Sequence, residues 1–284
     1  NQMPKLYADR VGMYNTMHIA KLSDGPISKI TVPKYSLSFK DSLSIFTTMM
    51  TRPFTGFGLN NKQFMNHYYE GQAELYDAYR QNMLHGKKSL MYSIPWHKMK
   101  GKRVLLFAGG TGDLTDYFAQ TIPELENVTI CDISDPMIKI ANERITKNNW
   151  QNVNARIEDV LDSNDFRSDE ANSYDIVICT YSLTMIPNWA KAVHTALKYL
   201  KPGGTFAVSD FTLTETQSVF SRFFWTTVFS RTHIYLNPNH IKMIQSLCDT
   251  EYLRIEYGDF PHIPLLLCPF YYGLFTKKED KKNV

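Results

Sequence analysis

The chain has 284 residues, 43% of them hydrophobic, which is enough for one large core or for one α/β domain with an appendage. Its 31 basic and 28 acidic residues give a formal net charge of +3, and the positive charges are spread along the chain. This charge does not indicate a nucleic-acid partner, although it is compatible with an anionic membrane surface. The four cysteines form no C-x-x-C pair, which argues against zinc and disulfides and favours a cytosol-facing protein. No run of about 18 apolar residues occurs, which argues against a spanning helix.

Residues 1–60 are predicted to form an N-terminal arm. The apolar positions from Ser36 to Met50 suit a short amphipathic helix or an extended segment. Two interpretations stay open, because such an arm can dock on the domain that follows or contact a membrane surface or a partner. The chain begins at Asn1 rather than Met, which suggests a part of a longer polypeptide.

Residues 61–276 are predicted to form the main domain, which opens with an aromatic helical region over residues 61–100. Side chains at spacings of three and four share one face of this region: Tyr69, Gln72, Ala73, Tyr76 and Arg80. A tyrosine stripe of this kind belongs either to the core or to a lid that closes over a bound ligand.

Strands and helices then alternate as in a doubly wound α/β sheet. Buried strands are predicted at 104–107, 128–132, 153–157, 174–180 and 205–210, with helices at 113–120, from the N-cap Ser134 onward, and at 189–200. Two antiparallel strands, at 252–257 and 271–276, complete a mostly parallel seven-stranded sheet. Residues 277–284 form a charged tail.

An aromatic cap insertion is predicted after the fifth strand, over residues 211–245. Its segment from Phe220 to Phe229 is rich in Phe, with Arg222 and Arg231 alongside. Such a segment is either a buried cap or a helix at the headgroup level of a bilayer, and both interpretations stay open.

The main candidate site is the turn after the first strand. It reads Ala108-Gly109-Gly110-Thr111-Gly112-Asp113, and its glycines let the backbone approach a ligand closely. Asp132 ends the second strand about 20 residues after Gly112, the spacing at which a carboxylate reaches the ribose hydroxyls of an adenosine-type cofactor. Glu158 and Asp159 end the third strand, where a carboxylate can accept a hydrogen bond from the adenine amine.

The same turn also discriminates between cofactors. A dinucleotide requires a full G-x-G-x-x-G, with a helix N-terminus facing the pyrophosphate. Asp113 would repel a diphosphate and instead favours a cationic or zwitterionic ligand. S-adenosyl-L-methionine fits, because its methionyl end carries an ammonium and a sulfonium.

These motifs, together with Leu200-Lys201-Pro202-Gly203-Gly204, resemble a class I S-adenosylmethionine-dependent methyltransferase over most of the main domain. Two positions depart from the pattern: Leu106 stands where many members have an acidic residue, and Ala108 replaces the first glycine, a variant also found in ubiquinone/menaquinone C-methyltransferases. The resemblance implies a Rossmann-like methyltransferase fold with S-adenosyl-L-methionine as cofactor. The cofactor-binding residues predicted from the motifs are Tyr76, Arg80, Ala108, Gly109, Gly110, Gly112, Asp113, Asp132, Ile133, Met137, Glu158, Asp159, Val160 and Tyr181.

A narrower resemblance rests on residues 69–80, 84–87, 181–187 and 261–272, which closely resemble the methyltransferase part of betaine-lipid synthase. That family methylates the amine of diacylglyceryl-homoserine three times to give diacylglyceryl-trimethylhomoserine. The resemblance implies a lipid substrate and a peripheral position at the cytoplasmic face of a membrane, the endoplasmic reticulum in a eukaryote. It also implies a fused or partner domain that transfers the aminocarboxypropyl group.

Methyl transfer from a sulfonium to an amine is a direct displacement, so the protein has mainly to align the groups and exclude water. A base or desolvation must first make the amine neutral, and the candidate bases are His85, His233, His262 and Asp210. Aromatic faces stabilise a quaternary ammonium by about 0.5–2 kcal/mol each, and the candidates are Tyr68, Tyr69, Tyr181 and Tyr235. The predicted catalytic residues are Tyr181, which follows the fourth strand, His233 and Tyr69; no metal ligand is predicted.

Two other functions stay open. An enzyme of the same fold and cofactor can act on a quinone ring carbon or on a phosphoethanolamine headgroup. A methyltransferase-fold subunit can also be catalytically silent and only bind a membrane, although the intact glycine turn and Asp132 argue against this.

Overall fold

The computed structural model describes residues 38, 40, 44, 45, 47, 58–70, 77, 78, 80, 81, 83–260 and 263–278. The predictions for most of the N-terminal arm, for Gln72, Ala73, Tyr76 and His262 and for residues 279–284 lie outside the described residues.

Helices and strands alternate along the described part of the chain. The helices are α3 (Asn61–Tyr69), α5 (His85–Ser93), α6 (Asp135–Lys147), α7 (Trp189–Tyr199), α8 (Val219–Ser230) and α9 (Asn239–Leu247). The strands are β1 (Arg103–Phe107), β2 (Asn127–Asp132), β3 (Val153–Ile157), β4 (Tyr174–Thr180), β5 (Leu200–Phe211), β6 (Cys248–Phe260) and β7 (Ile263–Lys277). Short 3-10 helices are η4 (Trp96–Lys98), η5 (Asp113–Asp116), η6 (Ile122–Glu124) and η7 (Ser168–Glu170).

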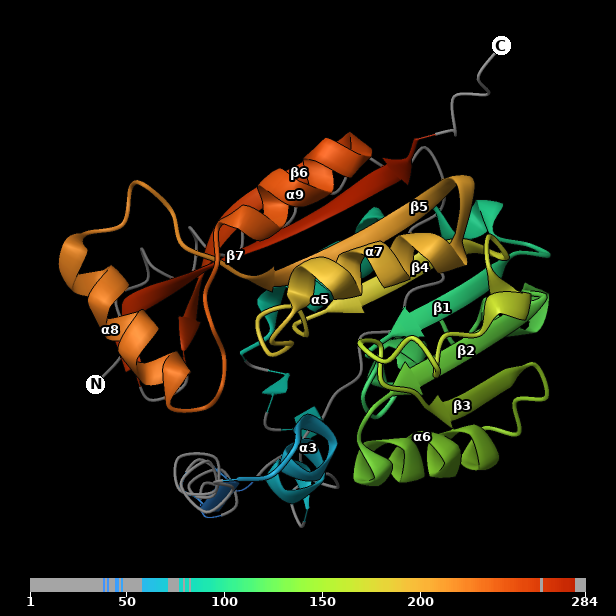
Figure 1. Cartoon of the computed structure of the whole chain (residues 1–284), viewed down its shortest axis with the longest axis horizontal. Coiled ribbons are helices and arrows are strands. Elements are labelled where there is room, and N and C mark those ends of the chain that lie inside the picture. The colour runs from blue at the N-terminus through green and yellow to red at the C-terminus, as the bar shows by residue number, and fades with distance from the viewer. Residues whose placement is uncertain are drawn as a thin grey trace.

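The described strands form one seven-stranded sheet in the order β3-β2-β1-β4-β5-β7-β6 (Figure 1). Strands β1 to β5 are parallel, and β7 runs antiparallel to both of its neighbours. This confirms the predicted doubly wound, mostly parallel sheet with two closing antiparallel strands. The strand order reverses between β1 and β4, and open α/β sheets bind their ligands at such a switch point, outside the carboxyl ends of the strands.

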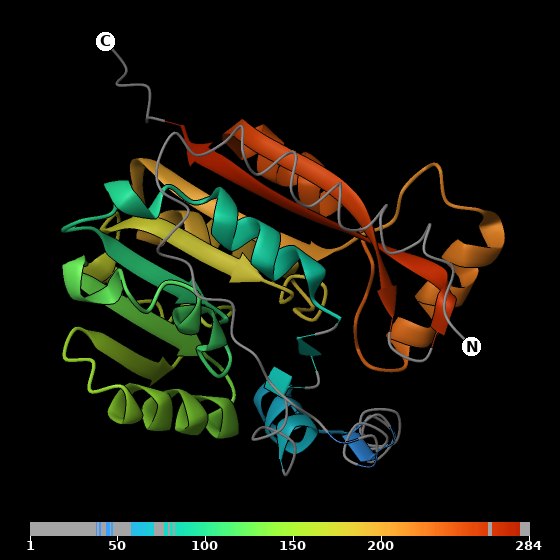
Figure 2. The ribbon, with the colours of Figure 1, turned by 180° about the vertical axis from the view of Figure 1, so that it is seen from behind.

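Side chains of the central strands alternate between two apolar cores, one on each face of the sheet. Leu106 and Ile130 belong to the core that α5 and α6 cover, whereas Leu105, Phe107 and Cys131 belong to the core under α7 and α9. Figure 1 shows α7 and α9 on one face, and the reverse view in Figure 2 shows α5 on the other. Because both faces are covered, the middles of these strands are mostly apolar, and this made them recognisable in the sequence.

Two local predictions, one after the glycine turn and one at the start of the fifth strand, are wrong in part. The helix predicted at 113–120 is helical only over Asp113–Asp116, as a 3-10 turn. Beyond it, Phe118 is fully buried and stacks on Trp96 with ring centroids 4.2 Å apart, so packing of this ring overrides helix propensity. The fifth strand begins at Leu200 rather than at Thr205, because the Lys-Pro-Gly-Gly residues bulge out of the ladder before pairing resumes.

The start of α6 differs from its predicted cap. Ser134 is the N-cap residue, as expected, but its hydroxyl makes no capping bond. The side chain of Asn66 in α3 performs this task, since its Oδ1 accepts the N–H of Asp135 at 2.9 Å. Helix α3 is therefore fastened to the start of α6, beside the carboxyl end of β2.

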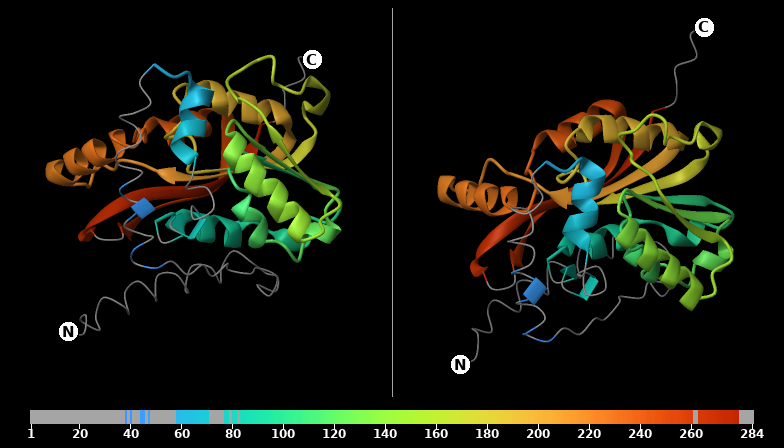
Figure 3. Two further views of the ribbon diagram at one scale, coloured as in Figure 1. Left: turned by 90° about the horizontal axis from the view of Figure 1, so that it is seen from below. Right: turned by 60° about the horizontal axis from the view of Figure 1, so that its bottom comes forward.

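Helix α8 projects from the body of the sheet (Figure 3). Ser221, Trp225 and Phe229 form its buried face, and the Trp225 indole donates a hydrogen bond to the Leu267 carbonyl at 2.9 Å. The predicted insertion therefore buries one face of α8 as a cap would, while the other face of this helix is exposed. Within the described residues, no helix is both long and apolar enough to cross a bilayer.

Candidate active site

A cleft opens at the carboxyl ends of the parallel strands, at the switch point between β1 and β4. Its empty volume is about 820 Å³ when the part open to solvent is counted. Most of the predicted site residues line it: Tyr69, Ala108, Gly109, Gly110, Asp113, Asp132, Ile133, Met137, Glu158, Asp159, Val160 and Tyr181.

The glycine turn forms one wall of this cleft with left-handed backbone at Ala108, Gly110 and Gly112. A Cβ on Gly109 would stand 2.8 Å from the Leu106 side chain, and one on Gly112 would stand 2.7 Å from Ile130, so both glycines are needed for packing. A Cβ on Gly110 would meet no protein atom within 4 Å. Gly110 therefore keeps open the space into which a ligand fits.

Asp132 holds the turn in place from the end of β2. Its two carboxylate oxygens accept the backbone N–H groups of Gly110 at 2.8 Å and Ser134 at 2.9 Å. Burial raises the pKa of Asp132, although these backbone hydrogen bonds oppose the rise. A carboxylate has about four acceptor sites, so Asp132 can accept further hydrogen bonds from a ligand in the cleft.

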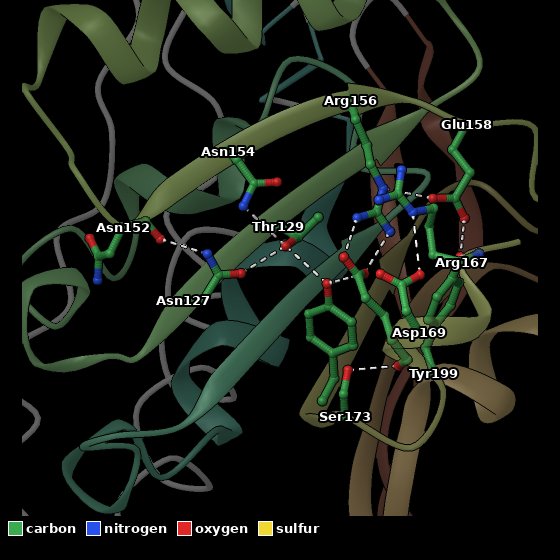
Figure 4. Close-up of polar contacts among 12 residues, drawn as sticks. Asn127, Thr129, Asn152, Asn154, Arg156, Glu158, Arg167, Asp169, Ser173 and Tyr199 are labelled. Carbon is green, nitrogen blue, oxygen red and sulfur yellow. Dashed lines mark hydrogen bonds and ion pairs between the residues drawn. The ribbon is translucent and has the colours of Figure 1, made fainter. Parts of the chain in front are cut away.

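The two acidic residues after β3 have different environments. Glu158 is 2% exposed, and its carboxylate accepts hydrogen bonds from Arg156 at 2.9 Å and from the Tyr199 hydroxyl at 2.8 Å (Figure 4). Burial raises the pKa of Glu158. Asp159 accepts the N–H of Leu161 through its Oδ1, so it keeps more acceptor capacity than Glu158.

Asp113 has a cationic partner that sequence reasoning missed. The Lys87 ammonium donates to both of its carboxylate oxygens, at 2.8 and 3.0 Å, and both side chains line the cleft. The prediction that Asp113 favours a cationic or zwitterionic ligand took no account of this lysine, and the wall presents one charge of each sign. Lys87 lies within residues 84–87, a segment that was recognised in the sequence without a role for this lysine.

Asp77, from the predicted lid, holds the same turn from outside. The Thr111 hydroxyl donates to its Oδ1 at 2.7 Å, and Arg144 donates to its Oδ2 at 2.5 Å. Burial, with the charge of Asp113 adding to it, raises the pKa of Asp77 to about 6. The lid region is thus hydrogen-bonded to the glycine turn.

The other wall of the cleft is aromatic. Tyr181 follows β4 with a left-handed backbone, its hydroxyl accepts the Gly86 N–H at 2.9 Å, and its ring lies edge-on to Phe211 at 4.7 Å. The hydroxyl of Tyr69, in α3, points to the Met185 sulfur at 3.6 Å. Met185 was not predicted, because it is one of 12 methionines and no local pattern distinguishes it.

Other predicted residues lie away from the cleft lining. His233 packs its ring on Phe64 with centroids 4.2 Å apart, and burial lowers the pKa of His233. Arg80 is 3% exposed and donates to the Tyr68 hydroxyl at 3.3 Å. Gly112 shapes the turn without lining the cleft.

The remaining candidate bases and aromatic residues that the structure describes also lie outside the cleft lining. The Nε2 atom of His85 lies 2.8 Å from the carbonyl oxygen of Asp259. Asp210 is fully buried, and its carboxylate accepts hydrogen bonds from the backbone N–H and the hydroxyl of Thr184. Tyr68 is fully buried, whereas Tyr235 is exposed outside the lining. Among the described residues, no histidine lines the cleft.

Comparison with known proteins identifies the chain at the level of a family. The model of the ubiE/COQ5 methyltransferase family matches residues 65–261. The ubiquinone/menaquinone biosynthesis C-methyltransferase UbiE of Shewanella pealeana is 33% identical over 117 residues, and that of Citrobacter koseri is 34% identical over 116 residues. Each match covers 39% of this chain and 43% of the relative, so the chain spans less than half the length of the curated relatives it matches.

Solved structures share the fold. Phosphoethanolamine N-methyltransferase 2 of Haemonchus contortus, in complex with S-adenosyl-L-methionine, has a TM-score of 0.58 and 17% identity, over 78% of this chain and 61% of that one. The CurJ carbon methyltransferase has a TM-score of 0.54 and 13% identity, over 89% of this chain and 77% of that one. With the fold, the glycine turn and the family match in agreement, the chain belongs to the ubiE/COQ5 methyltransferase family, a family of S-adenosylmethionine-dependent enzymes.

Proposed function

We propose that this chain is an N-methyltransferase that acts on the headgroup amine of a lipid and converts diacylglyceryl-homoserine to diacylglyceryl-trimethylhomoserine in three methyl transfers. The observation that carries the proposal is that two tyrosine side chains, Tyr69 and Tyr181, line the cleft near the end of β4. Aromatic faces stabilise the positive charge that such an amine acquires, by about 0.5–2 kcal/mol per ring. The resemblance of residues 69–80 and 181–187 to betaine-lipid synthase supports the choice of lipid.

The residues of the other wall fit S-adenosylmethionine. Asp132 and Asp159, at the ends of β2 and β3, offer carboxylate oxygens for the ribose hydroxyls and the adenine amine. Lys87 and Asp113 offer one charge of each sign for the methionyl carboxylate and ammonium. The open space above Gly110 leaves room for the ligand beside the turn.

When bound, S-adenosylmethionine would supply a methyl group to the lone pair of an amine: the N–C bond would form as the C–S bond breaks, and the neutral thioether would leave. The chain itself has to hold a neutral amine in line and keep water away. We assign this to Tyr69, Tyr181 and Met185, because an amine enclosed by their apolar surfaces is desolvated and its pKa falls. The amine proton leaves to solvent through the open mouth of the cleft, so a histidine base is not required.

A quinone ring carbon is the second candidate acceptor, since the matched relatives are named as ubiquinone/menaquinone biosynthesis C-methyltransferases. The fold does not separate the two acceptors, because an N-methyltransferase and a carbon methyltransferase resemble this chain about equally well. The tyrosine side chains favour the amine, because a quinone ring carbon does not become a permanent cation.

The test has two stages. Calorimetric titration of the folded chain with S-adenosylmethionine should release or absorb heat, and a flat titration would refute both enzyme proposals in favour of a silent subunit. Labelled cofactor is then incubated with diacylglyceryl-homoserine, phosphatidylethanolamine or a demethyl-quinone in detergent micelles. We expect mono-, di- and trimethylated betaine lipid by mass spectrometry; product from the quinone alone would establish the second candidate.

A further inference from the structure

Helix α8 carries an exposed apolar surface at its free end. Val219, Phe220 and Phe223 are 85%, 70% and 71% exposed. Their spacings of one, three and four residues place them on one side of the first turns of the helix. Single exposed apolar side chains are ordinary. These three lie together on a helix that projects from the sheet (Figure 3), and such a patch indicates a partner.

The charge of this helix selects the kind of partner. Residues 219–230 contain no Asp or Glu, and their one charged side chain is Arg222, which is exposed. Arg231 follows directly at the C-cap and is also exposed. Phenylalanines between arginines match the interface of a bilayer, where rings enter the acyl boundary and guanidinium groups stay with anionic headgroups. The 12-residue helix is too short to span a bilayer but long enough to lie in its surface.

The inner face of α8 connects this surface to the acceptor side of the cleft. Trp225 stacks on Phe229 at 5.3 Å, and Phe229 packs on Phe211 at 4.7 Å. Phe211 in turn lies 4.7 Å from the Tyr181 ring. A continuous set of aromatic rings therefore joins the helix to the wall at which we place the amine.

We propose that the outer surface of α8, formed by Val219, Phe220, Arg222 and Phe223, inserts into the interface of a bilayer that contains anionic lipid. This inference rests on the proposed function, because it takes the acceptor to be a lipid. The acyl chains stay in the bilayer while the amine headgroup reaches Tyr181. The helix thereby selects acceptors that are held in a membrane.

The experiment measures sedimentation of the full chain with vesicles of phosphatidylcholine and phosphatidylglycerol. The test variant is F220S/F223S, and the matched control is I255S, since Ile255 is an apolar side chain of β6 that is 46% exposed. We expect partitioning of F220S/F223S to weaken by about tenfold or more, because two phenyl rings no longer enter the interface. I255S should bind like the wild type, and R222Q should bind more weakly and lose part of the salt dependence.

Activity separates the surface from the proposed function. With a short-chain, water-soluble analogue of diacylglyceryl-homoserine, F220S/F223S should be as active as the wild type, whereas with the vesicle-bound acceptor it should lose about tenfold. Equal vesicle binding by all variants, or no binding by the wild type, would refute the proposal that this surface of α8 enters a bilayer. A concentration-dependent dimer that F220S/F223S abolishes would also overturn it, since the partner would then be a second copy. Vesicle binding without methylated product from either acceptor leaves the surface in place and refutes the proposed function instead.

Discussion

The two walls of the cleft are built in different ways. On the β2 and β3 side, the wall consists of backbone and of acidic residues at successive strand ends, and Asp132 holds the turn by accepting the Gly110 N–H. On the β4 side, the wall consists of large side chains from distant segments, such as Tyr69 from α3 and Tyr181 after β4. A backbone wall tolerates little change, whereas a side-chain wall can be altered gradually. We expect cofactor binding to be lost abruptly on substitution and acceptor selection to shift by degrees.

The largest effect is expected from Gly110→Leu. Its side chain would fill the space over the turn, and cofactor affinity should fall by about a thousandfold, or roughly 4 kcal/mol. The matched control is Gly203→Leu, since Gly203 also has a left-handed backbone with no protein atom within 4 Å of a Cβ, but it does not line the cleft. Both variants should lose about 1–2 kcal/mol of stability from backbone strain. Calorimetric titration checks affinity, and equal affinities for the two variants would contradict the backbone wall.

The second effect is a pH dependence of stability, which we attribute to Asp210, a buried residue next to the loop that carries Tyr181. Burial raises the pKa of Asp210 to about 7, and Asp210 holds Thr184 in the loop that also carries Tyr181. The folded chain therefore keeps a proton that the unfolded chain has lost between about pH 4 and 7. The free energy of unfolding should fall as the pH rises through this range, by about 2–4 kcal/mol.

The variant Asp210→Asn should reduce this slope, and the remainder comes from Asp77, Asp132 and Glu158, whose raised pKa values act in the same direction. The control is Asp175→Asn, because hydrogen bonds from Arg103, Lys201 and Lys102 lower the pKa of Asp175. Its contribution is lost only on acidification below its unfolded pKa of about 4, so the slope between pH 4 and 7 should stay. Urea unfolding at several pH values measures both, and a wild-type slope in Asp210→Asn would show that Asp210 is not the source.

The sequence was informative where structure is local. The central strands were found because both of their faces are buried, and Asp132 was placed by its spacing from the glycine turn. Contacts between distant segments were not accessible in the same way. Lys87 meets Asp113 only because α5 packs beside the turn, and Asn66 caps α6 across a gap of 69 residues. A histidine after an aromatic segment looked catalytic, yet no local pattern shows that its ring packs on Phe64.

The third effect separates the acidic residues of the backbone wall. Asp132→Ala should weaken cofactor binding by roughly 1–3 kcal/mol, since both the ribose hydroxyls and the Gly110 N–H would lose their acceptor. Glu158→Gln should leave affinity nearly unchanged, because the Glu158 carboxylate is already bound by Arg156 and Tyr199. Titration with S-adenosylmethionine compares the two, and a larger loss in Glu158→Gln than in Asp132→Ala would show that the Glu158 carboxylate contacts the cofactor.

The fourth effect tests the side-chain wall. Tyr69→Leu keeps an apolar side chain but removes the aromatic face, so KM for the amine acceptor should rise by about threefold to tenfold, or roughly 1 kcal/mol. Cofactor affinity should not change. Tyr235→Leu is the control, because Tyr235 is 55% exposed and lies outside the cleft lining. Steady-state kinetics at saturating cofactor give KM, and an equal rise in both variants would remove Tyr69 from the acceptor site.

The smallest effect is expected at His233, which the sequence suggested as a catalytic residue. Its ring packs on Phe64 and is absent from the cleft lining, and burial lowers the pKa of His233. Asn is the suitable replacement, because the residue has a φ of 56° and Asn tolerates the left-handed region. His233→Asn should change kcat by less than about twofold, or roughly 0.4 kcal/mol, and leave the pH–rate profile in place, because His233 lies outside the cleft lining. A tenfold loss of kcat with a shifted profile would instead mean that His233 moves into the cleft during turnover and takes the amine proton that we assign to solvent.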